Sequence, residues 1–347
     1  MRKICFVLLI LFSIAVPSYG VSFTVPTAPA SAQEYMDDNS ESFSEGLWHI
    51  ICQASKTLQP SITEATATCA GAVAVCVLIS LLSGIAGETN QAVEMAGAVC
   101  IAMMLISSAN SMIQLCVHTI QEITQYGRLL LPVMSGALAA QGGATRSGAL
   151  YIATAFFDTL LSSAISELLT PLVYIHICLS MVCRTFPQEL LESVCAFLKW
   201  LITWSLKIIL YVFTAYISIT GVVGGTTDAA MLKATKLTIS GVVPVVGGIL
   251  SDASEAVLVS AGVLKNAAGV YGLLVIIGLW IGPFIRIGIQ YLMLKITSGI
   301  CLMFGTKKAA TVVKDFAGTM GVVLGMLGAV CMMQLISTIC FMKGVSQ

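Results

Sequence analysis

The chain has 347 residues, of which 57% are hydrophobic and only 10% are charged, and its net charge is zero. Ordinary soluble domains carry roughly 25% charged residues, and the mean hydropathy here is +0.95. A soluble protein of this size could not bury so much apolar surface, so lipid must be the solvent for most of it. The equal numbers of acidic and basic residues also lack the basic excess of nucleic-acid-binding proteins. We therefore predict an all-α, polytopic membrane protein with about six to eight transmembrane helices, some broken by Gly or Pro.

Residues 1–20 have the pattern of a secretory signal peptide. Arg2 and Lys3 precede a short apolar core over residues 4–16, and Gly20 closes the segment. The core is shorter than the roughly 20 residues that a membrane span needs, which favours cleavage over an uncleaved anchor.

Residues 21–65 form the main polar segment, and Lys56 is its only base. Segments poor in Lys and Arg are typical of the non-cytoplasmic side, so we predict an extracytoplasmic acidic segment. Within it, residues 44–58 have the spacing of a short amphipathic helix, which Pro60 should end.

A first membrane helical region is expected over residues 66–223. Two clear apolar runs, about 66–86 and 92–113, are rich in small residues that allow close helix packing. Residues 114–128 are polar with regularly spaced apolar positions, as in an interfacial helix. Shorter, interrupted apolar runs then lead to a further span over about 199–223.

One face of this further span carries polar and aromatic side chains. Two interpretations stay open: an aromatic belt at the membrane interface with a snorkelling lysine, or a polar stripe that faces the interior of an assembly. The residues on this face are Trp200, Trp204, Lys207, Tyr211, Thr214 and Ser218.

Residues 224–266 combine a Gly-rich break with polar, small-residue helices. Gly247 and Gly248 precede Ser251, which can cap a helix. Asp252 and Glu255 then suit the positive end of a helix dipole.

A similar pattern, a glycine break followed by a cap and an acidic helix, occurs near residues 221–230. It is either an internal repeat, as in transporters with broken helices, or a chance similarity in a chain rich in Gly and Ala.

A C-terminal membrane helical region is expected over residues 267–347. Pro283 should kink or break its first apolar run. The lysines over residues 307–314 form the densest basic cluster, which predicts a cytoplasmic position. The last run carries Gly321-x-x-x-Gly325, a close-packing motif. With the acidic segment outside and the lysine cluster inside, the number of spans should be even.

Charged side chains inside apolar runs are the strongest candidates for functional positions. Each costs about 2.5–3.5 kcal/mol at the centre of a membrane helix, so each should face a partner or a water path. Glu167 and Arg286 lie at run ends, where snorkelling explains them, whereas Asp158 is expected to pair with Lys207 or Lys295. The candidate packing or conduit positions are Asp158, Lys207, Gly247, Gly248, Asp252, Glu255, Asn266 and Lys295.

The sequence carries no catalytic, metal-binding or cofactor-binding signature. It has no phosphate-binding loop, no H-E-x-x-H and no G-x-S-x-G, and its three histidines lie far apart. The twelve cysteines include no C-x-x-C and lie mostly in apolar runs, where Cys acts as a small hydrophobe. Asp252 and Glu255 fit helix-start acids better than an acid–base pair. We expect a protein that is not an enzyme and needs no cofactor.

Residues 243–257, V-P-V-V-G-G-I-L-S-D-A-S-E-A-V, resemble the stage III sporulation protein AE family of endospore-forming Gram-positive bacteria. The continuation through Lys265-Asn266 to Gly269 and Gly272 is similar as well. The order of parts, a signal, an acidic segment and then multiple spans, extends the resemblance over nearly the whole chain.

The resemblance implies a multi-pass protein of the mother-cell membrane around the forespore. In this family, the protein is part of a secretion-like channel complex between the two cells that supports late forespore gene expression. The implied partners are other stage III sporulation membrane and ring proteins, a cytoplasmic secretion-type ATPase and a forespore membrane protein. The family offers no catalytic residues to transfer. A secondary transporter, which should show a substrate site at two matching broken helices, and a structural membrane scaffold remain as alternatives.

Overall fold

The computed structural model describes residues 25–36, 42–86, 90–141, 143–185, 191, 193–217 and 247–342. For residues 85–86, 90–91, 184–185, 247–262 and 264 it describes the backbone alone. The predicted signal peptide and the pattern near residue 221 lie outside the described residues. All regular elements in the described part of the chain are helices, as the sequence predicts. They are α2 (Ala30–Gln33), α3 (Phe43–Ala86), α4 (Asn90–Ala140), α5 (Ala144–Ser163), the π-helix η2 (Ala164–Leu169), α6 (Thr170–Thr185), the helix Ser193–Ile217, α8 (Gly247–Met303) and α9 (Lys307–Met342).

Six helices in the described residues are long and apolar enough to cross a membrane, with α5, η2 and α6 acting as one. This number is even and lies at the lower end of the predicted range. The helices are nevertheless far longer than a bilayer requires. The 57 residues of α8 rise about 85 Å and the 51 residues of α4 about 77 Å, whereas the hydrocarbon core is about 30 Å thick.

The predicted helix end at Pro60 is wrong, because Pro60 lies inside the continuous helix α3. Pro283, which was predicted to kink or break its run, does not break it, since α8 continues through this residue. Proline is tolerated inside membrane-protein helices where neighbouring groups satisfy the freed backbone atoms. Next to Pro60, the Ser61 Oγ donates to the Thr57 carbonyl at 2.7 Å. The expected boundary between residues 65 and 66 therefore falls inside one helix.

Residues 114–128 are not a separate interfacial helix, since α4 runs through them without interruption. Their apolar positions are core residues: Cys116, Ile120 and Ile123 are fully buried. The apolar spacing was correct, but it marks the face of α4 that packs on the bundle rather than a face that lies on a membrane surface.

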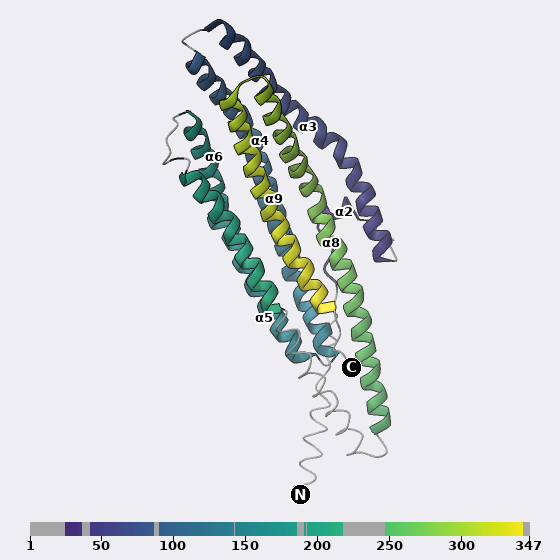
Figure 1. Ribbon diagram of the computed structural model, residues 1–347. Helices are drawn as coiled ribbons and strands as arrows, with labels where there is room; N and C mark the ends of the chain where they lie inside the picture. The colour runs from purple at the N-terminus through teal and green to yellow at the C-terminus, as the bar shows by residue number, and fades with distance from the viewer. Residues whose placement is uncertain are drawn as a thin grey trace.

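The chain folds as a bundle of nearly parallel helices with α9 at its centre, as Figure 1 shows. Helix α9 contacts α8, α4, α5 and α6. Its most apolar 18-residue stretch is 56% buried inside the protein, the highest value among the six candidate spans. It follows α8 through a tight turn at Gly305, whose φ of 77° favours glycine. Next to this turn, the Ser298 Oγ donates to the Ala310 carbonyl at 2.8 Å and joins the two helices. The tip of the α3–α4 hairpin projects beyond the ends of the other helices (Figure 1).

The segment over residues 25–36, which includes α2, packs against α8 and bonds to α4. The Ala28 amide donates to the Tyr271 hydroxyl at 3.2 Å. Ala32 lies against Gly278 and Tyr35 against Gly282, so two glycines four positions apart on α8 leave room for this segment. Irregular backbone is tolerated at membrane depth only where protein or water covers it, and Ala28, Ala32 and Tyr35 are buried.

Candidate functional site

The most deeply buried carboxylate among the predicted positions is Asp158, with 1% of its surface exposed. It lies on α5 in a buried face that repeats every three or four residues, the spacing of one side of a helix. A charged group at such a position requires partners, because burying an unpaired charge is costly. The buried residues of α5 are Arg146, Ser147, Leu150, Ala153, Thr154, Phe157, Asp158 and Leu161.

Two other helices supply the groups around Asp158. The Gln334 side chain on α9 donates a hydrogen bond of 2.6 Å to one carboxylate oxygen, Oδ1. The Nε of Arg128 on α4 lies 3.8 Å from the other oxygen, Oδ2, which is buried without a hydrogen bond. The site thus joins α4, α5 and α9 through one carboxylate, a neutral amide and a guanidinium group.

Glycine at position 127 makes this arrangement sterically feasible. A Cβ atom there would lie only 2.6–2.8 Å from the Gln334 amide group. Nearby, the Thr154 and Ser337 hydroxyls bond to each other at 2.8 Å, which links α5 and α9 one helical turn away. The polar atoms therefore lie in a layer across the middle of an otherwise apolar interface.

The predicted pairing of Asp158 with Lys207 or Lys295 is wrong. Both lysines are exposed on the outside of the bundle, and the Lys295 ammonium lies 5.3 Å from the centre of the Tyr291 ring. Arg286 does not simply snorkel from the end of its run, since its Nη2 donates to Glu64 Oε2 at 2.6 Å. Asp158 and Arg286 are thus paired across helices, with partners that sequence spacing alone did not suggest.

The remaining candidate positions lie near the start of α8. This helix begins at Gly247, ahead of Ser251, so the predicted cap at Ser251 is wrong. Asn266 is exposed. The side chains of Asp252 and Glu255 lie outside what the structure describes, and the roles predicted for these two residues and for Gly248 stay predictions.

Sequence analysis missed Arg128 and Gln334. Arg128 follows a polar stretch and was interpreted as part of an interfacial helix. Gln334 is the only residue with a side-chain amide in the last apolar run, and that feature could have marked it as a partner for a buried charge.

The chain was compared with known proteins. The family model for stage III sporulation protein AE matches residues 30–344. The chain belongs to this family. The resemblance seen around residues 243–257 is therefore confirmed, and it extends over nearly all the described helices.

A curated relative in the stage III sporulation protein AE family comes from Bacillus subtilis (strain 168) and is itself named stage III sporulation protein AE. It is 24% identical to the chain over 246 residues, which are 70% of this chain and 58% of the relative. The chain thus spans less than two thirds of that relative's length. No solved structure matches the chain.

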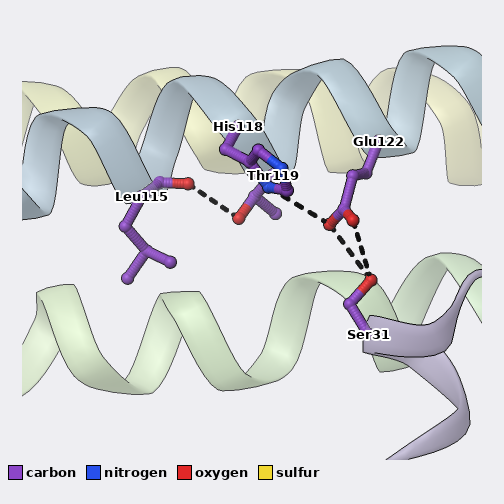
Figure 2. Close-up of polar contacts among 5 residues, drawn as sticks. All are labelled: Ser31, Leu115, His118, Thr119 and Glu122. Atoms are coloured by element: carbon purple, nitrogen blue, oxygen red, sulfur yellow. Dashed lines mark hydrogen bonds and ion pairs between the residues drawn. The ribbon is translucent and has the colours of Figure 1, made fainter.

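A second polar contact in this family member holds the segment over residues 25–36 in place. Figure 2 shows Ser31 on α2 pointing at Glu122 on α4, with His118 beside the same carboxylate. The Ser31 hydroxyl lies 3.1 Å from both carboxylate oxygens, and His118 Nδ1 lies 3.7 Å from Oε2. A hydrogen bond to a charged group is worth about 1.5–3 kcal/mol, so this contact fixes the segment against α4.

Neither polar site has the composition of a metal centre. Within the described residues, no group of three or more His, Cys, Asp or Glu could hold a metal ion. Both sites instead join helices that are distant in sequence, which is a packing role for polar groups in membrane proteins.

Proposed function

We propose that the protein is a non-enzymatic component of the mother cell–forespore channel complex, located in the mother-cell membrane around the forespore. Membership of the stage III sporulation protein AE family supports a role in sporulation. The proposed partners are other stage III sporulation membrane and ring proteins, a cytoplasmic secretion-type ATPase and a forespore membrane protein.

The length of the exposed apolar surface is the observation that carries this proposal. Val263 and Met303, near opposite ends of α8, are 65% and 86% exposed. The helix rises about 60 Å between them, and even a tilt of about 40° leaves this distance well above the 30 Å of a hydrocarbon core. Part of the apolar exterior must therefore lie outside the bilayer, where it needs a protein cover.

The α3–α4 hairpin contributes much of this surface. Its tip projects beyond the other helices (Figure 1) and carries several large, exposed apolar side chains. A membrane protein that acts alone, such as a secondary transporter, would not need so long an apolar exterior. The exposed side chains of the hairpin are Leu78, Leu81, Leu82, Met103, Met104 and Ile106.

Deleting the gene in its own endospore-forming host tests the proposal. We expect normal vegetative growth, normal engulfment and loss of late forespore gene expression, measured with a late forespore reporter. An intact copy should restore the reporter. Normal reporter activity in the deletion strain would contradict the proposal, and so would coupled ion or substrate flux by the purified protein alone in liposomes, which would identify a transporter.

A further inference from the structure

The helix Ser193–Ile217 fixes the level of the bilayer along the bundle. Only 11% of its most apolar 18-residue stretch is buried inside the protein, the lowest value among the six candidate spans. Its outer face is aromatic along its length: Phe197, Trp200 and Trp204 stack in a row, and Tyr211 is 71% exposed. A helix so little covered by protein needs lipid around it, with its aromatic side chains suited to the membrane interface.

Contacts with the central helices place this span at the same height along the bundle as the α8 segment between Gly269 and Tyr291. Phe213 packs on Phe157, whose neighbour Asp158 bonds to Gln334 of α9. On α9, Gly321 lies against Tyr291 of α8, and Met342 lies against Gly269 of α8. Gln334 comes between Gly321 and Met342 on α9, so it lies at a height between Tyr291 and Gly269.

The N-terminal half of α3 lies at this same level. Ile50 and Ala54 pack in one cluster with Leu274 of α8, and Glu64 pairs with Arg286. These α8 residues fall between Gly269 and Tyr291. Residues 45–64 of α3 are therefore level with the lipid-facing helix Ser193–Ile217.

At that level α3 has a polar stripe, which lies opposite the side that packs on α8. On a 100° wheel its residues fall within about 140° of the helix circumference. From Glu45 to Glu64 the stripe rises about 29 Å, close to the 30 Å of a hydrocarbon core. The stripe consists of Glu45, Gln53, Lys56, Gln59, Thr63 and Glu64, all exposed except Gln53, which is partly buried.

The remaining outward side of α3 is apolar. Trp48, Ile51, Leu58 and Ile62 are 40–67% exposed and occupy the sector between the stripe and the buried face. Apart from Ser55, the outer surface of α3 at this level is thus divided lengthwise into a polar and an apolar half. The outside of the helix Ser193–Ile217 is mostly apolar, and its exposed charges are Lys199 and Lys207, whose long side chains can snorkel to the interface.

We infer that the polar stripe of α3 faces water within the bilayer and lines part of a hydrophilic passage, an inference that rests on the proposed function in a channel complex. Among the described residues, Lys56 Nζ bonds to Gln53 on the same helix at 2.9 Å, and Glu64 bonds to Arg286 of α8, with both side chains more than 40% exposed. Lys56 lies nearest the middle of the stripe, about 17 Å from Glu45 and about 12 Å from Glu64, and a charge at the centre of a helix in lipid costs about 2.5–3.5 kcal/mol. In this arrangement, the apolar flank of α3 contacts the neighbouring subunit that forms the rest of the wall of the passage.

Cysteine accessibility in the assembled complex tests this inference. Single cysteines replace Lys56 or Thr63 in the stripe, Ile51 or Leu58 in the apolar flank, and Ile208 in the lipid-facing helix, in a protein otherwise free of cysteine. One further variant keeps only the native Cys52, which is exposed on the same helix next to the stripe. The probe is a membrane-impermeant, charged methanethiosulfonate. Thiols react as thiolates and need water, so Lys56→Cys and Thr63→Cys should react on the order of tenfold faster than Ile51→Cys, Leu58→Cys and Ile208→Cys.

Co-purification of the variants with the partner ATPase and the late forespore reporter are measured in the same strains. If the complex assembles, the reporter is active and the stripe positions are as unreactive as Ile208→Cys, the passage inference is overturned while the proposed function stands. If stripe and flank positions react equally fast, α3 lies outside the bilayer and the inference is overturned as well. If the reporter is active without any assembled complex, the proposed function itself fails.

Discussion

Replacing Gln334 with leucine is expected to lower the free energy of unfolding by about 1–3 kcal/mol. The substitution removes the only hydrogen bond that the structure gives to the Asp158 carboxylate, and it leaves this buried group with Arg128 as its nearest partner. Unfolding of the purified protein in mixed micelles with increasing denaturing detergent measures the change. The neighbouring Met333→Leu, at an equally buried position, is a volume-conserving control and should cost less than 1.5 kcal/mol, an approximate upper limit for such changes.

The double variant Asp158→Leu/Gln334→Leu distinguishes the broken polar pair from a general packing defect. Removing both partners of a buried polar contact is often less harmful than removing one, because no unsatisfied group remains. We therefore expect the double variant to be more stable than the sum of the two single variants predicts. Strictly additive costs would show that Asp158 and Gln334 do not depend on each other.

Replacing Gly127 with valine is expected to have an effect of similar size, a loss of about 1–3 kcal/mol from overpacking. A Cβ atom at this position would come within 2.6 Å of the Gln334 amide nitrogen. The Gln334 side chain has little freedom to move aside, because it is buried and its amide bonds to Asp158. The same detergent-unfolding measurement applies.

Gly325→Val is the matched control, since no heavy atom lies within 4 Å of a Cβ atom at position 325. Its cost should stay within about 0.5 kcal/mol. Equal losses for the two variants would show that contact with Gln334 does not decide the outcome. The control also bears on the Gly321-x-x-x-Gly325 motif: Gly321 lies against Tyr291 at 3.3 Å, whereas Gly325 faces open space within this chain.

Composition and hydropathy were enough to predict the helical membrane class, because apolar runs of this length have few other stable solutions. The ends of the helices were harder to predict. The expectation that Pro60 ends a helix and that Pro283 kinks or breaks one comes from soluble proteins, where a proline inside a helix costs about 3 kcal/mol. In α3 and α8, continued packing along the bundle outweighs this cost.

The candidate site was predicted in part. Asp158 was identified because a carboxylate in the middle of an apolar run needs a partner, and the structure indeed buries it among polar groups. The identity of those groups depends on which helices become neighbours and at what height. Sequence periodicity shows which face of a helix is buried, but it does not show that Arg128 and Gln334 reach the level of Asp158.

The offset between apolar runs was also beyond sequence analysis. Hydropathy suggests that all spans share one bilayer level, with residues 66–86 as the first of them. In the structure, residues 50–64 of α3 lie beside the α8 segment that is level with the helix Ser193–Ile217. This offset leaves the α3–α4 hairpin with an exposed apolar surface, which the proposed channel complex would cover.

Purification of the tagged full chain from sporulating cells in a mild detergent, followed by native mass spectrometry, tests the central claim most directly. The account predicts a particle much heavier than the 36.5 kDa chain, which contains the secretion-type ATPase and other stage III sporulation proteins. A single chain, recovered without partners from cells in which late forespore gene expression is active, would contradict it.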